Sequence, residues 1–182
     1  MRFLFSGRLP AALSPDTPDR SSSGSVPAAA EAGFMHAAIA EAREGIRNGH
    51  GGPFGSVVVR NGVIVGRGHN RVLVNNDSTA HGEIQAIRDA EASLETHDLT
   101  GCTLYTTAEP CPMCLAACLW ANIKTVRYGC TIEDTDRIGF RDRLFEEILG
   151  KRKLPKGFLT EFGREECLEL FEEYAALDAE RY

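Results

Sequence analysis

The 182-residue chain lacks three features: an excess of basic residues, a long apolar run and a regular cysteine framework. Its 20 Lys and Arg against 26 Asp and Glu leave a formal net charge of −6, which argues against a broad nucleic-acid surface because phosphate binding needs a basic stripe. No apolar run approaches the roughly 20 residues that a membrane span requires. The six scattered cysteines favour buried thiols in a reducing, cytoplasmic compartment over disulfides.

The first part of the chain differs in composition from the remainder. Residues 14–30 are rich in Ser, Pro, Asp and Ala, so residues 1–32 are expected to form a disordered extension. With 43% hydrophobic residues overall, the chain is long enough for one well-filled domain and too short for two of ordinary size. That domain is placed at residues 33–182.

Strand and helix patterns alternate along this domain. A helix over 34–46 precedes two β-branched runs, 54–60 and 63–66, which the Asn-Gly dipeptide at 61–62 joins as a hairpin. Further strands are expected at 102–107, 125–129 and 157–160, and further helices at 83–90, 112–121, 140–149 and from about 165, the last with an apolar stripe of Leu168, Phe171 and Leu177. The order predicts an α/β fold, a three-layer α/β/α arrangement with a mixed five-stranded sheet.

Two short motifs supply three potential zinc ligands. His-Gly-Glu at 81–83 provides an imidazole and a carboxylate, and Pro-Cys-Pro-Met-Cys at 110–114 provides two thiols. Structural zinc sites usually close with four protein ligands, whereas hydrolytic sites use three and leave one position to water. No fourth ligand stands at ligand spacing beside His81, Cys111 and Cys114, so the count favours a catalytic Zn²⁺.

Both motifs are predicted to lie at the start of a helix. Strong helix formers follow Glu83, and Pro112 fits the first turn of the second helix. Cys111 and Cys114 would share a face at the positive end of that helix, which lowers the pKa of a thiol and favours the thiolate that zinc binds. Alone, Cys-x-x-Cys is as typical of a redox pair as of a metal site, and His-x-Glu is common by chance. The combination of the two motifs indicates a zinc site.

Residues 34–182 resemble the cytidine deaminase-like superfamily of zinc-dependent deaminases, which carries H-x-E followed by P-C-x-x-C. The similarity is to its guanine deaminase branch, through segments at 51–55, 68–70, 119–121 and 138–142 and the terminal tyrosine. The resemblance implies hydrolysis of a free nucleobase, guanine to xanthine plus ammonia, by a cytoplasmic homodimer of purine metabolism.

The resemblance also implies roles for particular residues in the chemistry. His81, Cys111 and Cys114 match the zinc ligands, and Glu83 matches the carboxylate that shuttles protons. Asp142 matches a second carboxylate that contacts the purine and assists the departure of ammonia; without the resemblance it reads equally well as a surface acid.

Four more residues match substrate contacts in the family. Asn70 matches the residue that hydrogen-bonds the base, although it could instead brace the turn after the hairpin. Trp120 lies where the family places a ring beside the substrate, and core filling is its alternative. Phe54 would stack on the base or pack in the core. Tyr182 matches a residue that closes over the pocket, in some members that of the partner subunit, or is a frayed terminus.

The sequence also departs from the guanine deaminase pattern. Gly82 stands between His81 and Glu83, where alanine is commoner in the family. This glycine and the segment 66–70 are reminiscent of fungal cytosine deaminases. Arg141 stands where guanine deaminases often carry an acidic residue. Cytosine, isocytosine, guanosine and cytidine are therefore alternative substrates. A tRNA adenosine deaminase would need a basic approach surface, and a non-catalytic zinc module would have no use for Glu83. No role is assigned to three histidines expected at the surface or in turns: His36, His50 and His97.

Overall fold

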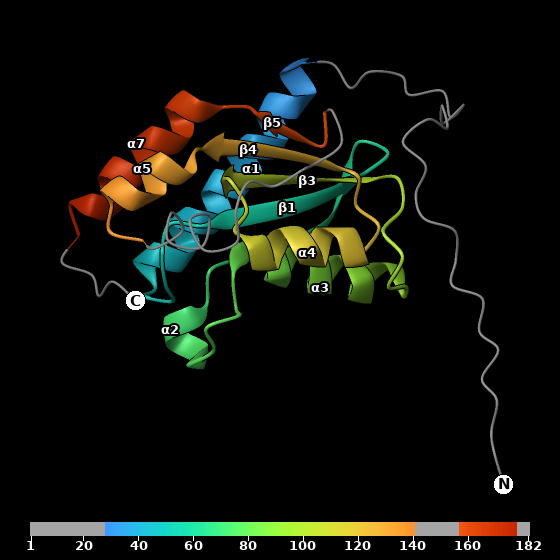
Figure 1. Cartoon of the computed structure of the whole chain (residues 1–182), viewed down its shortest axis with the longest axis horizontal. Coiled ribbons are helices and arrows are strands. Elements are labelled where there is room, and N and C mark those ends of the chain that lie inside the picture. Colours follow the sequence, from blue (N-terminus) through green and yellow to red (C-terminus); the bar gives the residue numbers. More distant parts are fainter. Residues whose placement is uncertain (1–27, 141–156, 178–182) are drawn as a thin grey trace, which may run out of the picture.

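A computed structural model describes residues 28–140 and 157–177 of the chain. The expected three-layer α/β/α fold with a mixed five-stranded sheet is confirmed (Figure 1). The strands are β1 (Gly55–Arg60), β2 (Val63–His69), β3 (Cys102–Ala108), β4 (Thr125–Cys130) and β5 (Leu159–Glu161). The helices are α1 (Ala28–Arg47), α2 (Val72–Asn75), α3 (Gly82–Leu94), α4 (Pro112–Trp120), α5 (Ile132–Arg137) and α7 (Arg164–Ala175).

The sheet has the strand order β2-β1-β3-β4-β5. β1 pairs antiparallel with β2 and β3, whereas β3, β4 and β5 run parallel to one another. The expected hairpin is present between β1 and β2, and its turn places Asn61 at φ 51° and Gly62 at φ 77°. Two successive residues with positive φ are what a two-residue type I′ turn requires, and Asn-Gly is the dipeptide that adopts it most readily.

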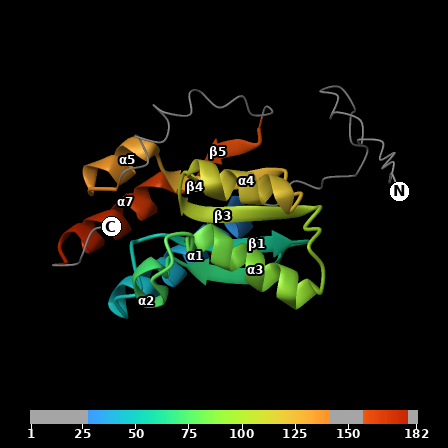
Figure 2. The same ribbon diagram turned by 60° about the horizontal axis from the view of Figure 1, so that its bottom comes forward.

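Side chains that alternate along the strands fill two separate cores. Val58, Leu104 and Val126 pack beneath α3 and α4, whereas Val57 and Tyr105 face the other way, toward α1 and α7. This alternation follows from the two-residue period of a strand. Figure 2 shows α3 and α4 lying beside each other on one face of the sheet.

Several boundaries differ from those expected. α1 begins at Ala28, ahead of the boundary placed at residue 33, and the expected helix at 140–149 falls almost entirely outside the described residues. The apolar stripe expected on the last helix was wrong in part, because Leu177 lies beyond the end of α7 and is 42% exposed. The residues that α7 buries are Cys167, Leu170, Phe171 and Tyr174.

The cysteines and the helices agree with the composition. All six thiols are free and buried, as expected for cysteines that act as small apolar side chains or metal ligands. Among the helices of the described residues, none combines the length and apolarity that crossing a membrane would need.

Candidate active site

The two zinc motifs meet where α3 and α4 begin. His81 is the residue before α3 and Cys111 the residue before α4, and both have extended backbone conformations that turn the chain into the helix. Pro112 occupies the first turn of α4, where its missing N–H costs no hydrogen bond. Cys114 follows one turn later and is fully buried, so the helix starts expected from sequence are confirmed and bring all three ligands together.

The geometry of the three ligand atoms fits a zinc ion. The Nδ1 of His81 lies 3.7 Å from the Sγ of Cys111 and 3.5 Å from the Sγ of Cys114, and the three atoms all lie within 4.8 Å of one another. Zinc bonds of about 2.3 Å to sulfur and about 2.05 Å to nitrogen, at a tetrahedral angle, would place the two ligand atoms about 3.6 Å apart. Among the described residues, this is the one group with metal-ligand spacing.

The two thiols differ in their acidity. A hydrogen bond from Cys114 and the nearby His81 lower the pKa of Cys111 to about 4, against the effect of burial. The same contact with Cys111, together with burial, raises the pKa of Cys114 well above its usual value. The protein thus prepares one thiolate without a cation, and a divalent ion would be needed to hold the second thiol in its ionised form.

Glu83 lies in the first turn of α3 and is 5% exposed. Burial raises the pKa of its carboxyl group to about 7, although His81 opposes the shift. The Cys114 thiol also opposes the rise in the pKa of Glu83. A buried carboxyl group beside a three-ligand metal position is therefore present where general acid–base chemistry would need it.

Asn70 follows β2 and is 1% exposed. Its backbone N–H donates to the carbonyl of Phe54, and its Oδ1 accepts the N–H of Val72 at 3.2 Å. Its Nδ2 is buried without a hydrogen-bond partner among the described residues. A buried donor of this kind costs about 1–3 kcal/mol unless an acceptor meets it, so the amide is suited to a ligand acceptor.

Two glycines let the backbone close around this position. A β-carbon on Gly51 would overlap the Oδ1 of Asn70, and one on Gly82 would lie 2.7 Å from the carbonyl oxygen of Phe54. The glycine between His81 and Glu83 thus has a local reason in this chain, since α3 begins directly against the backbone that precedes β1.

Phe54 is held by an aromatic cluster. Its ring meets that of Phe140 edge to face at a centroid distance of 4.7 Å and that of Phe171 at 6.0 Å. Phe140 in turn contacts Tyr174 at 6.1 Å. Sequence reasoning placed Phe171 in the apolar stripe of the last helix but connected neither Phe140 nor Phe171 with Phe54; for Phe140, its place in the 138–142 motif was the available signal.

Of the remaining predicted substrate contacts, the one within the described residues, Trp120, does not lie beside the metal ligands. Trp120 is the last residue of α4, whereas the cysteine ligands lie at the start of this helix. Its side chain is 87% exposed, so the alternative prediction that Trp120 fills the core was wrong. At 1.5 Å per residue, it stands about 9 Å along the helix axis from Cys114. Asp142 and Tyr182 lie outside the described residues, and their roles stay predictions.

His50 was expected at the surface or in a turn and is instead half-buried, with its Nδ1 2.9 Å from the Nε2 of His69. No local sequence pattern predicts this contact, because the two histidines are 19 residues apart.

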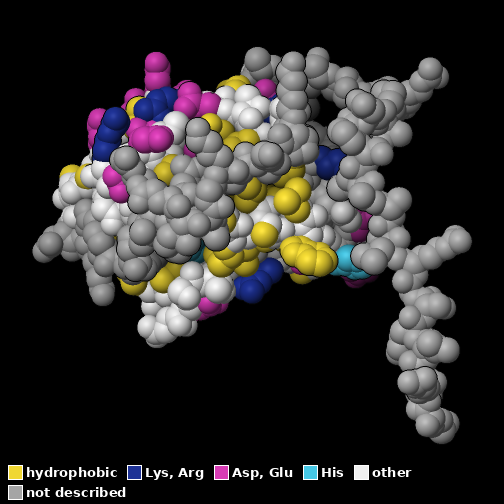
Figure 3. Space-filling model, in the orientation of Figure 1, with side chains coloured by type: hydrophobic (Ala, Val, Ile, Leu, Met, Phe, Trp, Pro, Cys, Tyr) yellow, Lys and Arg dark blue, Asp and Glu magenta, His cyan; other side chains and the backbone are white. Residues whose placement is uncertain are grey.

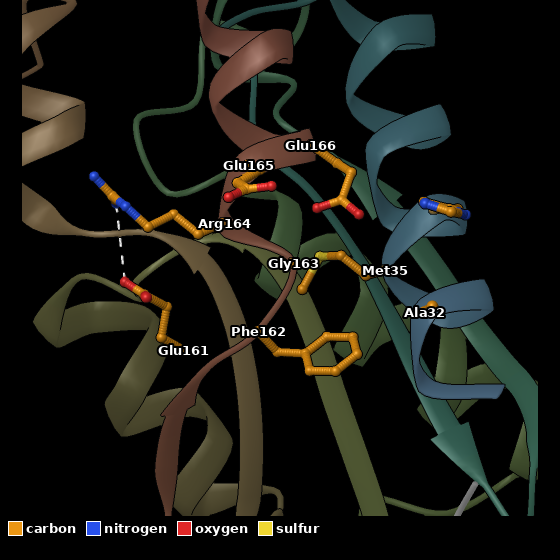
Figure 4. A pocket seen from close by; sticks show the side chains of 9 residues that line it. Ala32, Met35, Glu161, Phe162, Gly163, Arg164, Glu165 and Glu166 are labelled. Carbon is orange, nitrogen blue, oxygen red and sulfur yellow. Dashed lines mark ion pairs between the residues drawn. The ribbon is translucent and has the colours of Figure 1, made fainter. Parts of the chain in front are cut away.

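A hollow of about 480 Å³ lies away from the metal ligands, between α1 and the start of α7 (Figure 4). Met35 and Phe162 line it together with Glu165 and Glu166, while Arg164 extends toward Glu161. Carboxylates in the first turn stabilise a helix through its dipole, which accounts for the two glutamates. This hollow lies on the α1 side of the sheet, whereas the ligands lie on the α3 and α4 side.

Comparisons with known proteins agree with the site. Residues 29–130 match the family described as the cytidine and deoxycytidylate deaminase zinc-binding region. A guanine deaminase of Bacillus subtilis is 46% identical over 116 residues, covering 63% of this chain and 74% of that protein. A tRNA-specific adenosine deaminase of Buchnera aphidicola is 33% identical over 123 residues, covering 67% and 79%. The solved structure of a guanine deaminase from Nitrosomonas europaea has a TM-score of 0.69 at 28% identity, covering 94% of this chain and all of that one.

The fold, the ligand trio and the matched family together define a zinc-dependent hydrolase that acts on carbon–nitrogen bonds. The chain belongs to the cytidine deaminase-like superfamily, in its guanine deaminase branch.

Proposed function

We propose that this chain hydrolyses guanine to xanthine and ammonia. The observation that carries the proposal is the trio of ligand atoms at zinc spacing with the buried carboxyl group of Glu83 beside it. The choice of base is supported by the similarity to guanine deaminases, which extends over most of the chain in the structure from Nitrosomonas europaea. In the reaction a carbon–oxygen bond to water forms and the carbon–nitrogen bond to the amino group breaks.

His81, Cys111 and Cys114 would hold the zinc ion, since two thiolates and a neutral imidazole balance its charge. Zinc bound there supplies a Lewis acid that brings the ionisation of water toward the neutral range. Three protein ligands leave one position accessible to water, which distinguishes this arrangement from a closed structural site.

Glu83 moves protons in this scheme. It accepts a proton from the attacking water and delivers it to a ring nitrogen of the base, which makes the carbon that bears the amino group electrophilic. It then takes the remaining proton of the added hydroxyl group and delivers it to that amino group, so that ammonia leaves as the carbonyl of the product forms. Asp142 is proposed to assist this last step, by the resemblance alone.

Asn70 and Phe54 orient the base. Because the Oδ1 of Asn70 is occupied by the N–H of Val72, the free Nδ2 donates to an acceptor on the ring. The carbonyl oxygen of guanine is such an acceptor, whereas the corresponding position of adenine carries an amino group, a donor. Phe54, whose ring packs against Phe140 and Phe171, is proposed to contact the ring face of the base.

The test is ammonia release by the zinc-loaded protein from guanine, guanosine, cytosine, isocytosine, adenine and cytidine, with Glu83→Ala as the blank. Preferred turnover of guanine is expected. Preference for cytosine or for a nucleoside would overturn the choice of base while keeping the zinc chemistry. Zinc retention without ammonia from any of these compounds would overturn deamination and favour a non-catalytic zinc module.

We further propose that the chain forms a homodimer through α4 and acts in a reducing cytoplasm, which suits its six free thiols. α4 contains no charged residue, and its last two side chains, Leu119 and Trp120, are 51% and 87% exposed. Figure 3 shows hydrophobic side chains gathered over this part of the surface. An apolar helix of this kind is normally covered, and a second copy would cover it.

The dimer is tested by light scattering after gel filtration. Leu119→Glu should convert a dimer to a monomer, whereas Val63→Glu, at a side chain that is 62% exposed on β2, should leave the dimer intact. A wild-type chain that is monomeric at micromolar concentration would contradict this proposal.

A further inference from the structure

A chain of polar side chains lies behind Asn70. The Nδ1 of His69 lies 3.4 Å from the Oε2 of Glu41, and its Nε2 lies 2.9 Å from the Nδ1 of His50. The guanidinium of Arg71 reaches the same Nδ1 of His50 at 3.4 Å. The two imidazole rings are stacked, with centroids 5.1 Å apart. His69 is 7% exposed, so these contacts form largely out of water.

The donors and acceptors in this chain define how its members are linked. An ionised Glu41 can only accept, so the Nδ1 of His69 donates to it. The Nε2 of His69 and the Nδ1 of His50 share one hydrogen bond, whose donor depends on the tautomer of the two rings. Arg71 can only donate, and its guanidinium reaches the same Nδ1 of His50.

The surrounding charges agree with these links. The hydrogen bond from His69 lowers the pKa of Glu41 against the effect of burial, and Arg67 adds to the lowering. Burial and the charge of Arg71 lower the pKa of His50, with Glu44 opposing them. Arg71 and Glu41 thus contact the two ends of the histidine pair.

These side chains adjoin the backbone that positions Asn70. His69 precedes Asn70 directly, and the carbonyl of His50 accepts the backbone N–H groups of Leu73 and Val74 at the start of α2. His50 also precedes Gly51, whose α-carbon faces the Oδ1 of Asn70 so closely that no side chain fits between them. The histidine pair therefore joins the two segments that enclose the Asn70 amide.

We propose that Glu41, His69 and His50 form a positioning clamp that holds the Asn70 amide with its Nδ2 free for the substrate. The clamp connects α1 to the end of β2 and to the segment before β1. The proposal rests on the proposed function in one respect, the contact between Asn70 and the base. These are positioning residues, since they act on the substrate through Asn70.

A double-mutant cycle tests whether the clamp acts through Asn70. Glu41→Gln, which keeps a hydrogen-bonding side chain but removes the charge, should lower kcat/KM for guanine about tenfold. In the Asn70→Ala background the same change should have less than a twofold effect, because the group it positions is gone. Equal losses in both backgrounds would show a general structural role and overturn the clamp.

Two matched comparisons separate the clamp from loss of folding. Arg43 lies on α1, as Glu41 does, and pairs with Glu173 on α7; Arg43→Gln removes this ion pair and should leave kcat/KM unchanged. His50→Asn keeps an acceptor near the position of Nδ1 and should retain most activity, whereas His50→Leu should lose about as much as Glu41→Gln. Equal activity of the two His50 variants would overturn the proposal.

A readout without substrate separates failure of the clamp from failure of the proposed function. In ¹⁵N-labelled protein near neutral pH, the Asn70 side-chain amide signals should shift in Glu41→Gln and stay in place in Arg43→Gln. Asn70 amide signals that are unchanged in Glu41→Gln would overturn the clamp even if guanine is turned over. If Asn70→Ala leaves guanine turnover unchanged, the role of the clamp falls while deamination through Glu83 stands.

Discussion

Cys111, Cys114 and His81 are individually ordinary side chains whose chemistry depends on their spacing. Cys111 and Cys114 are three residues apart on one helix, which the sequence alone reveals because the helical period is local. His81 comes from another helix, and its Nδ1 approaches both sulfur atoms at 3.5–3.7 Å. The ligand set was predictable because both halves are short motifs at helix starts.

The first prediction concerns these ligands. Cys114→Ser should lose most bound zinc, because a serine hydroxyl is not ionised at neutral pH and is a poor zinc ligand. Cys118→Ser alters a buried thiol one turn further along α4 and should retain zinc. Zinc content is measured by atomic emission after dialysis, and equal content in the two variants would contradict the assignment of Cys114.

Other residues of the site were beyond the reach of sequence reasoning. That the Asn70 Nδ2 has no acceptor among the described residues depends on Val72 occupying its Oδ1. The contact between His50 and His69 joins segments 19 residues apart and leaves no periodic trace. For Trp120 the sequence suggested a contact that the structure lacks: a large aromatic residue on a helix is usually buried, but this side chain is 87% exposed.

At the scale of elements, the β1–β2 hairpin was predicted because its turn chemistry is local. Gly62 adopts φ 77°, a conformation that costs a residue with a β-carbon about 1 kcal/mol or more. Gly62→Ala should therefore lower the free energy of unfolding by about 1 kcal/mol without affecting activity, since the turn lies at the other end of β1 from Gly55. Urea unfolding measures this loss of stability. The control is Asn61→Gly, because glycine adopts the positive φ of position 61 without strain.

Two helices are tied by a buried carboxylate whose partner no sequence pattern indicates. Asp134 is 2% exposed, caps α5 by accepting the N–H and hydroxyl of Thr131, and pairs with Arg164 at the start of α7. The Arg164 guanidinium holds the pKa of the Asp134 carboxyl well below its usual range. The pair fixes α7, which carries Phe171 and Tyr174 to the aromatic cluster behind Phe54.

This pair predicts a particular dependence of stability on pH. The pKa of Asp134 is lower in the folded than in the unfolded chain, so its stabilisation is complete above the unfolded value of about 3.9 and is lost as pH falls toward the folded value. Asp134→Asn should lower stability by about 2 kcal/mol at pH 7.

The difference between wild type and Asp134→Asn should shrink progressively below about pH 4. Thermal unfolding across pH measures it, with Asp136→Asn, an exposed residue of α5, as the control. A difference that is the same at pH 7 and at low pH would show that the Asp134 charge contributes nothing.

At the scale of the whole molecule, the layered fold was predictable and the assembled site only partly so. Alternating strands and helices after a hairpin dictate the mixed sheet, and parallel pairing of β3, β4 and β5 follows from their connecting helices. The buried face of α7 was predicted only in part: Phe171 was expected, but Cys167, Leu170 and Tyr174, which share its face at helical spacing, were not.

The whole molecule also brings together three elements that a motif search treats separately. The starts of α3 and α4 supply the metal ligands and Glu83, and the end of β2 supplies Asn70. α1 adds Glu41 behind that asparagine. Activity in this account therefore depends on parts of the chain that never touch the substrate.

The most direct test of the account is turnover of guanine by the zinc-loaded Glu83→Gln variant, with zinc content measured on the same sample. The account predicts full zinc occupancy with kcat/KM lowered by a factor of about 100 or more, because glutamine preserves the shape of the side chain but cannot carry the proton. Turnover close to that of the wild type at full zinc occupancy would contradict the role of Glu83 and, with it, the proposed mechanism.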